Sequence, residues 1–230
     1  MPRHGGTHAA LAVAALLTTL GLAAPAAADP PPTVAVGVLT HTGVGGPDVR
    51  VGDVAQAKLK AGTTANLYSG LTSTTRVSCA ESTFTASIRT NPVAPGTATA
   101  SLTAQTFGSC TSTIPGTFGA SKVVVDNLPF ATAISSGGAV KVSGTNAAPI
   151  QVTVTLQNAI GALTCVYRAN GNTISGVASN ASAATSIAFT HQPFTRVSGP
   201  NTCFAAAYFS ATYAPVRDIS QPGSPIIYVN

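Results

Sequence analysis

The sequence predicts an all-β protein built from two tandem antiparallel β-sandwich-like (immunoglobulin-like) modules behind a cleaved signal peptide. Beyond the N-terminal segment, apolar residues recur at every second position and β-branched residues are frequent, as is typical of strands. Short apolar segments alternate with Gly, Pro and Asn turn signals, a spacing that favours a sandwich or a barrel. Two similar stretches of this kind each contain two of the four cysteines.

The N-terminal segment has the features of a signal peptide. Arg3 gives it a short basic start, an apolar run follows over residues 9–22, and small residues lead up to Ala28. Ala26 and Ala28 fit the small-x-small pattern of signal peptidase sites, so we expect cleavage between Ala28 and Asp29. The apolar run is shorter than the roughly 20 residues that a membrane anchor needs. We therefore expect a mature chain without a membrane span.

The candidate strands are short and are spread along the whole chain. In the first half they are Thr33–Leu39, Val54–Leu59, Ala65–Tyr68, Phe84–Ile88, Ala98–Thr106 and Lys122–Val125. In the second half they are Gln151–Leu156, Leu163–Tyr167, Thr173–Val177, Ser186–His191, Phe204–Tyr208 and Ile226–Val229. The dipeptide Asn170-Gly171 between two of them is typical of two-residue turns, so we expect a β-hairpin there.

The two halves contain the same six-residue pattern. Leu102–Phe107 and Phe189–Phe194 both read apolar-Thr-x-Gln-x-Phe, and each lies at a similar distance from a preceding cysteine. This offset predicts a duplicated module, with chance similarity in a Thr- and Ala-rich chain as the alternative. The Gly-rich stretch between the copies gives modules of residues 29–143 and 144–230, which are either separate domains or two halves of one core.

Four cysteines in an exported chain predict two disulfide bonds. The repeat favours Cys79 with Cys110 and Cys165 with Cys203, because each module then has its own bridge. The spacings of 31 and 38 residues correspond to about 3.5–4 kcal/mol of stabilisation per bridge in the chain-entropy model. No C-x-x-C spacing is present, so we expect no zinc site.

Composition argues against several classes of function. Charged residues make up 7% of the chain and are scattered, whereas nucleic-acid binding needs clustered basic residues. The mature chain has two histidines, and it lacks the local motifs of hydrolases, zinc proteases and P-loop enzymes. We expect His41 to be exposed and His191 to be a structural residue of a strand. A triad assembled from distant residues is the alternative, but we predict no enzyme activity, no cofactor and no metal.

Three stretches, together with the four cysteines, carry a resemblance: Val51–Asp53, Ala65–Tyr68 and Leu128–Thr132. With them the chain resembles uncharacterised secreted β-rich, two-disulfide proteins of high-GC Gram-positive bacteria, which are usually labelled only by their signal sequence. The resemblance covers residues 29–220 and implies export without an assigned activity. The chain is less similar to the enediyne-carrying apoproteins, which are smaller secreted β-sandwiches with two disulfides and shorter disulfide loops.

Disulfide-bonded sheets and few titratable groups favour a secreted, non-enzymatic binding or structural protein, extracellular or associated with the cell envelope, whose ligand the sequence does not indicate. One alternative is a small-molecule carrier, which predicts an apolar pocket on the order of a few hundred Å3. The other is a protease inhibitor that presents the Pro-rich segment Pro92–Gly96 as a rigid bait loop. Such segments also occur in ordinary turns.

Overall fold

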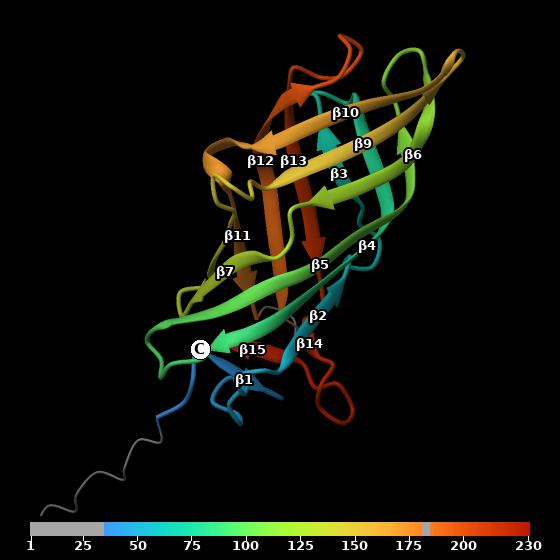
Figure 1. The fold of residues 1–230 in the computed structure, drawn as a ribbon. Coiled ribbons are helices and arrows are strands. Elements are labelled where there is room, and N and C mark those ends of the chain that lie inside the picture. The colour runs from blue at the N-terminus through green and yellow to red at the C-terminus, as the bar shows by residue number, and fades with distance from the viewer. Residues whose placement is uncertain (1–34, 181–184) are drawn as a thin grey trace, which may run out of the picture. The chain divides into compact units, whose positions relative to one another are not determined.

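Antiparallel strands make up almost all of the regular structure (Figure 1). The computed structural model describes residues 35–180 and 185–230. The strands of the first half are β1 (Leu39–His41), β2 (Val54–Lys58), β3 (Ala65–Tyr68), β4 (Arg76–Thr90), β5 (Thr97–Ser112), β6 (Thr117–Asp126), β7 (Phe130–Ser135) and β8 (Ala139–Ser143). Those of the second half are β9 (Gln151–Asn158), β10 (Gly161–Ala169), β11 (Thr173–Ser179), β12 (Ser186–Ser198), β13 (Ala206–Tyr213), β14 (Arg217–Asp218) and β15 (Ile227–Val229). A short 3-10 turn, η1 (Asn170–Asn172), joins β10 to β11. The predicted all-β class is confirmed.

Eight of the strands close into an antiparallel barrel. In the ring each strand pairs with the next in the order β3, β4, β5, β7, β8, β11, β12 and β13, and β13 pairs back with β3. Closure leaves no unpaired edge within this ring, which is how barrels avoid edge-to-edge association. Inward-facing side chains alternate with outward-facing ones along each strand.

The remaining strands extend the barrel. The C-terminal half of β12 pairs with β10, which continues through β9 to β6. On the other side, β2 lies between β4 and β14. β1 and β15 form a separate two-stranded sheet.

This architecture differs from tandem sandwich modules. Strands on opposite sides of the predicted boundary after residue 143 pair with each other five times, as β1–β15, β2–β14, β3–β13, β6–β9 and β8–β11. Residues 29–143 and 144–230, as far as the structure describes them, therefore share one core, and Ala35–Asn230 forms one compact unit. Alternation along a strand shows which face is buried but not which strand lies beside it. The predicted cleavage site between Ala28 and Asp29 lies outside the described residues.

The expected hairpin at Asn170-Gly171 is also wrong. β10 and β11 do not pair with each other. Both pair with β12, at residues 194–198 and 186–189 respectively. Gly171 and Asn172 have φ angles of 64° and 54°, in the left-handed region where Gly and Asn are favoured. These two residues change the direction of the chain between β10 and β11, which pair with successive parts of β12.

Both predicted disulfides are confirmed. Cys79–Cys110 joins residues that lie directly opposite each other on β4 and β5. Cys165–Cys203 joins β10 to the segment that precedes β13. The first bridge thus links two neighbouring strands, and the second links a strand to a turn.

Candidate functional site

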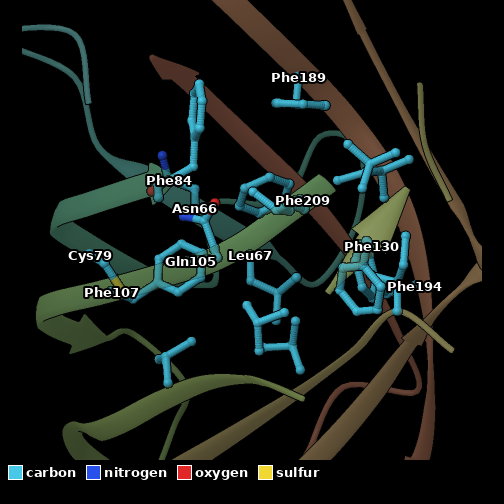
Figure 2. Close-up of a pocket in the computed structure, with 18 of the residues that line it drawn as sticks. Asn66, Leu67, Cys79, Phe84, Gln105, Phe107, Phe130, Phe189, Phe194 and Phe209 are labelled. Atoms are coloured by element: carbon cyan, nitrogen blue, oxygen red, sulfur yellow. The ribbon is translucent and has the colours of Figure 1, made fainter. Parts of the chain in front are cut away.

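The inward-facing side chains of the barrel, together with side chains of β6 and β9, surround an apolar cavity of about 110 Å3. Six of the eight phenylalanines of the chain line it: Phe84, Phe107, Phe130, Phe189, Phe194 and Phe209. Figure 2 shows these rings projecting from different strands towards a common interior. The cavity is smaller than the few hundred Å3 expected of a carrier pocket.

The cavity has two kinds of wall. Around Phe209 the wall is aromatic, with ring centroids of Phe107 and Phe189 at 6.2 and 6.3 Å. On the side of β6 and β9 it is aliphatic, because Val123 and Val125 lie opposite Val154 and Val152 and all four line the cavity. Residues from both halves of the chain therefore build one site.

A β-bulge shapes each copy of the six-residue pattern. Leu102 and Gln105 are three residues apart on β5 but lie opposite Ala86 and Phe84, which are two apart on β4. An extra residue in one strand places both side chains on one face, where simple alternation would separate them. Leu102, Gln105 and Phe107 consequently all line the cavity.

The second copy has its bulge at the same place. Phe189 and Gln192 lie opposite Ala211 and Phe209 on β13. Phe189 and Phe194 line the cavity, while Gln192 accepts a hydrogen bond from the backbone N–H of Ser175 at 2.6 Å. The Thr-x dipeptide of both copies is thus the bulge.

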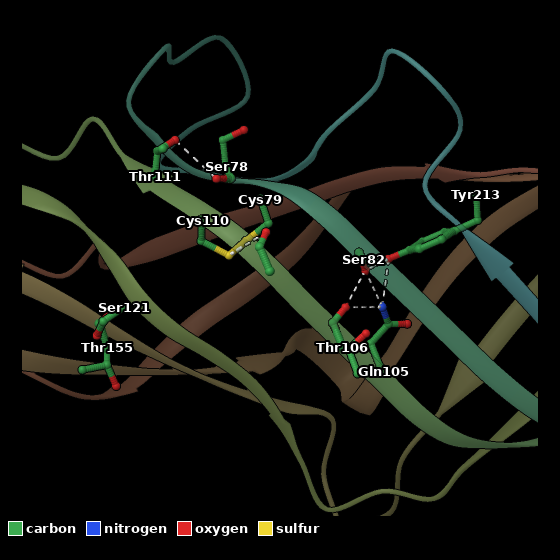
Figure 3. The surroundings of a disulfide bond; sticks show 11 residues. Ser78, Cys79, Ser82, Gln105, Thr106, Cys110, Thr111, Ser121, Thr155 and Tyr213 are labelled. Carbon is green, nitrogen blue, oxygen red and sulfur yellow. Dashed lines mark hydrogen bonds between the residues drawn. A yellow bond between two sulfur atoms is a disulfide. The ribbon is translucent and has the colours of Figure 1, made fainter.

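A hydrogen-bonded group crosses the barrel interior next to the first disulfide (Figure 3). Gln105 Nε2 donates to Ser82 Oγ at 2.7 Å and to the hydroxyl oxygen of Tyr213 at 3.0 Å, and Ser82 Oγ donates to the Thr106 carbonyl at 2.7 Å. Burial raises the pKa of Tyr213 to about 12, and the hydrogen bonds with Ser82 and Gln105 only partly oppose this. The phenol therefore stays neutral and acts as a structural group.

Two buried polar atoms, in two residues that line the cavity, have no hydrogen-bond partner. Among the described residues, the buried side-chain atoms without a partner are Thr132 Oγ1 and Asn66 Oδ1, and both residues line the cavity. Buried polar groups are nearly always paired. No motif marks either residue in the sequence.

A buried polar cluster brings together residues of β1 and β14 and the residue that precedes β2. His41, Asp53 and Asp218 place ligand-type atoms within 4.8 Å of one another, and His41 Nε2 lies 2.9 Å from Asp218 Oδ2. The expectation that His41 is exposed is wrong, since only 9% of it is accessible. The Thr- and Gly-rich sequence around it suggested an exposed loop, but β1 pairs with the distant β15.

Protein donors already occupy the carboxylates of this cluster. Asp53 accepts from the backbone N–H of Arg50 and from Gln221 Nε2, and Asp218 accepts from the backbone N–H and the hydroxyl of Ser220. Burial by itself would raise the pKa of Asp218, but the hydrogen bonds from Ser220, and then that from His41, outweigh it and lower the pKa. The side chains of these three residues are of types that can bind metal ions. The hydrogen-bonding capacity of the two carboxylates is nevertheless used by protein donors, as in a structural hydrogen-bond network.

The other predicted residues lie elsewhere. His191 occupies the β12 bulge with φ of 46° and packs against Tyr68, with ring centroids 5.9 Å apart. In the Pro92–Gly96 segment, the Pro92 carbonyl accepts from the backbone N–H of Val38, and the Ala94 N–H donates to the Val36 carbonyl. The backbone of the proposed bait loop is thus already paired within the protein.

Comparisons with known proteins give no relative: the sequence matches no protein-family model and no curated protein, and the fold matches no solved structure. In the described part of the chain, no helix is long and apolar enough to cross a membrane. The two disulfides fit an extracellular protein.

Proposed function

We propose that the protein is an extracellular, non-enzymatic binding protein that holds a small apolar molecule inside its barrel. The observation that carries this proposal is the apolar cavity, whose walls come from phenylalanine and aliphatic side chains of both halves of the chain. Closed eight-stranded barrels have an interior wide enough to hold one small ligand. An engineered apolar cavity of about 150 Å3 binds benzene or xenon. The volume of about 110 Å3 therefore suits a single-ring or smaller ligand.

The paired backbone of Pro92–Gly96 favours this function over protease inhibition. A bait segment offers its backbone to the protease, whereas this segment has hydrogen bonds to residues 36 and 38. The predicted signal peptide supports the extracellular location, and N-terminal sequencing of material from the medium should find Asp29 as the first residue.

Ligand binding can be tested with toluene as the probe. At ten times its dissociation constant, toluene should stabilise the folded protein by about 1.4 kcal/mol, which corresponds to a rise in Tm of roughly 3–6 °C. Val123→Phe should abolish this rise because Val123 lines the cavity. Val124→Phe is the matched control, because Val124 is the next residue on β6 and is not part of the lining.

Two results would contradict the proposal. One is the absence of any toluene-dependent change in Tm or in methyl NMR shifts. The other is an equal response of the Val123→Phe and Val124→Phe variants, since binding inside the barrel should distinguish neighbouring residues on opposite faces of one strand.

A further inference from the structure

We propose that one end of the molecule docks onto a membrane surface that contains anionic lipids. The proposal starts from three apolar side chains at this end, since Ile160, Phe118 and Leu71 are 96%, 75% and 59% exposed. They belong to the connections β9–β10, β5–β6 and β3–β4, which we call the loop end. The loop end consists of residues 69–75, 113–118 and 158–161. None of the three side chains lines the barrel cavity, so this surface is separate from the proposed ligand site.

Hydrogen bonds and strand pairing bring the three connections together. The first connection ends at Arg76, whose backbone N–H donates to Thr113 Oγ1 of the second connection at 2.9 Å. The second connection leads into β6, where Thr117 lies opposite Asn158 at the start of the β9–β10 turn. Figure 1 shows the β5–β6 connection and the β9–β10 hairpin at the same end of the molecule. The exposed side chains therefore belong to one surface.

The position of Ile160 is not explained by turn geometry or by core packing. Gly161 pairs with Asn158, so Ile160 lies in a two-residue turn, where Gly, Asn, Asp and Ser are favoured. Its side chain is almost fully exposed and contributes nothing to the core. Single exposed apolar residues are normal on protein surfaces, whereas several gathered at one place mark an interaction surface.

The charge distribution favours an anionic partner. The loop end contains no charged residue, so its burial desolvates no charge. Arg76 directly follows its first segment, and Arg196 lies at the same end, because its backbone N–H donates to the Ala205 carbonyl and β13 begins beside the end of β3. The buried acidic cluster lies elsewhere, since Ile88, near the other end of β4, donates its N–H to the Asp53 carbonyl. Arginines near an anionic lipid surface strengthen binding.

A lipid surface fits this arrangement better than a protein partner does. A stable protein–protein interface needs roughly 1,000 Å2 or more of complementary surface, whereas the apolar side chains of the loop end come from three separate connections. Binding to a membrane interface depends on the apolar area that is buried and on attraction between basic residues and anionic lipids. The loop end supplies both contributions.

Fluorescence can locate the surface that contacts lipid. The chain has no tryptophan, so Phe118→Trp and Ile160→Trp each place a single reporter at the loop end. Val51→Trp is the matched control, because Val51 is 67% exposed and the neighbouring Gly52 donates its N–H to the Ile88 carbonyl near the other end of β4. With equimolar phosphatidylglycerol and phosphatidylcholine vesicles, emission from the two loop-end reporters should shift to the blue and be quenched by brominated acyl chains. Emission from the control should do neither.

Co-sedimentation with the same vesicles measures the affinity. Ile160→Ser should weaken binding roughly tenfold, because a nearly fully exposed isoleucine loses its burial in lipid. Val51→Ser should change the affinity less than about twofold, and neither variant should change the Tm, since both side chains are exposed. Vesicles of phosphatidylcholine alone, or about 0.5 M salt, should weaken binding of the wild type. All variants share the same N-terminus, so differences between them report the substituted positions.

Two results would overturn the proposal directly. One is that the wild type binds neither kind of vesicle, and the other is that Ile160→Ser and Val51→Ser weaken binding equally. Self-association in sedimentation equilibrium that Ile160→Ser abolishes, without vesicle binding, would overturn it as well, because the loop end would then bind a second copy of the chain. The toluene experiment reports the cavity alone, so the two proposals can fail independently.

Discussion

Replacing Tyr213 by phenylalanine tests the hydrogen-bonded group inside the barrel. The side chain is 1% exposed, and its hydroxyl oxygen lies 2.9 Å from Ser82 Oγ and 3.0 Å from Gln105 Nε2. Phenylalanine keeps the ring contact with Phe84, whose centroid is 5.2 Å away. Ser82 and Gln105 remain bonded to each other, so no partner is left isolated. The expected loss of stability at neutral pH is about 1 kcal/mol.

The same substitution should become favourable at high pH. Burial raises the pKa of Tyr213 to about 12 in the folded protein, against 10.0 for an unperturbed tyrosine. The unfolded chain therefore loses the proton first, and the folded state is destabilised as pH rises through this interval. The loss for one tyrosine is about 1.4 kcal/mol at pH 11 and approaches about 2.7 kcal/mol above pH 12. Since the phenylalanine variant lacks this loss, the two stability curves should cross between about pH 10 and 11.

Urea unfolding followed by circular dichroism at several pH values between 8 and 11.5 measures this crossing. Tyr167→Phe provides a parallel case, because burial also raises the pKa of Tyr167 to about 12, against the opposing effects of Phe204 and Arg196. A difference in unfolding free energy between wild type and Tyr213→Phe that stays constant over this range would refute the reasoning.

Three further predictions concern the cluster, the disulfides and the bulge. Asp218→Asn should cost about 1–3 kcal/mol at pH 7, because one carboxylate oxygen becomes an amide nitrogen that cannot accept the hydrogen bonds made to Asp218. The lowered pKa of Asp218 gives stability that is present above about pH 4 and lost on acidification. The stability of the variant should therefore depend less on pH below about pH 4. Thermal melts in which the Tm of wild type and variant falls equally with decreasing pH would count against this. Replacing either Cys79–Cys110 or Cys165–Cys203 by serines should lower the unfolding free energy in urea by about 3.5–4 kcal/mol, and a loss below about 1 kcal/mol would contradict it. Deleting His191 should leave a protein that is folded by circular dichroism, because regular alternation then keeps Gln192 and Phe194 on the inner face. Deleting Pro193 should prevent folding, because it moves Phe194 to the outer face. Equal effects of the two deletions would contradict the bulge assignment.

The sequence predicts the strands better than their neighbours. Ala65–Tyr68 has the bounds expected from its alternation, and Val54–Leu59 differs from β2 by one residue. Phe84–Ile88 covers only part of β4, because the polar stretch around Glu81 interrupts the alternation. Partner choice depends on contacts between residues far apart in the chain, and no local pattern encodes them.

The residues that line the cavity could not be predicted from the sequence for the same reason. Its two unpartnered polar groups, Asn66 and Thr132, lie in different strands of the barrel and carry no motif. His41 shows the opposite failure, since a sequence typical of an exposed loop is buried by pairing with the C-terminal strand. In both cases the environment of a residue is set by contacts with segments that are distant in the sequence, which local patterns do not show.

The six-residue pattern was the local sequence signal that pointed to the cavity, although it was interpreted as a sign of duplication. A strand of strict period two cannot place the first and fourth residues of apolar-Thr-x-Gln-x-Phe on one face, so the pattern itself requires one extra residue between them. Both copies have that residue as a bulge, and in both the partner strand supplies a Phe-x-Ala segment, Phe84–Ala86 on β4 and Phe209–Ala211 on β13. β4 precedes its partner in the chain, however, whereas β13 follows, so a simple tandem repeat does not account for the pairing. The shared feature is better explained by a common task, which is to direct two large apolar side chains from each bulged strand into the cavity.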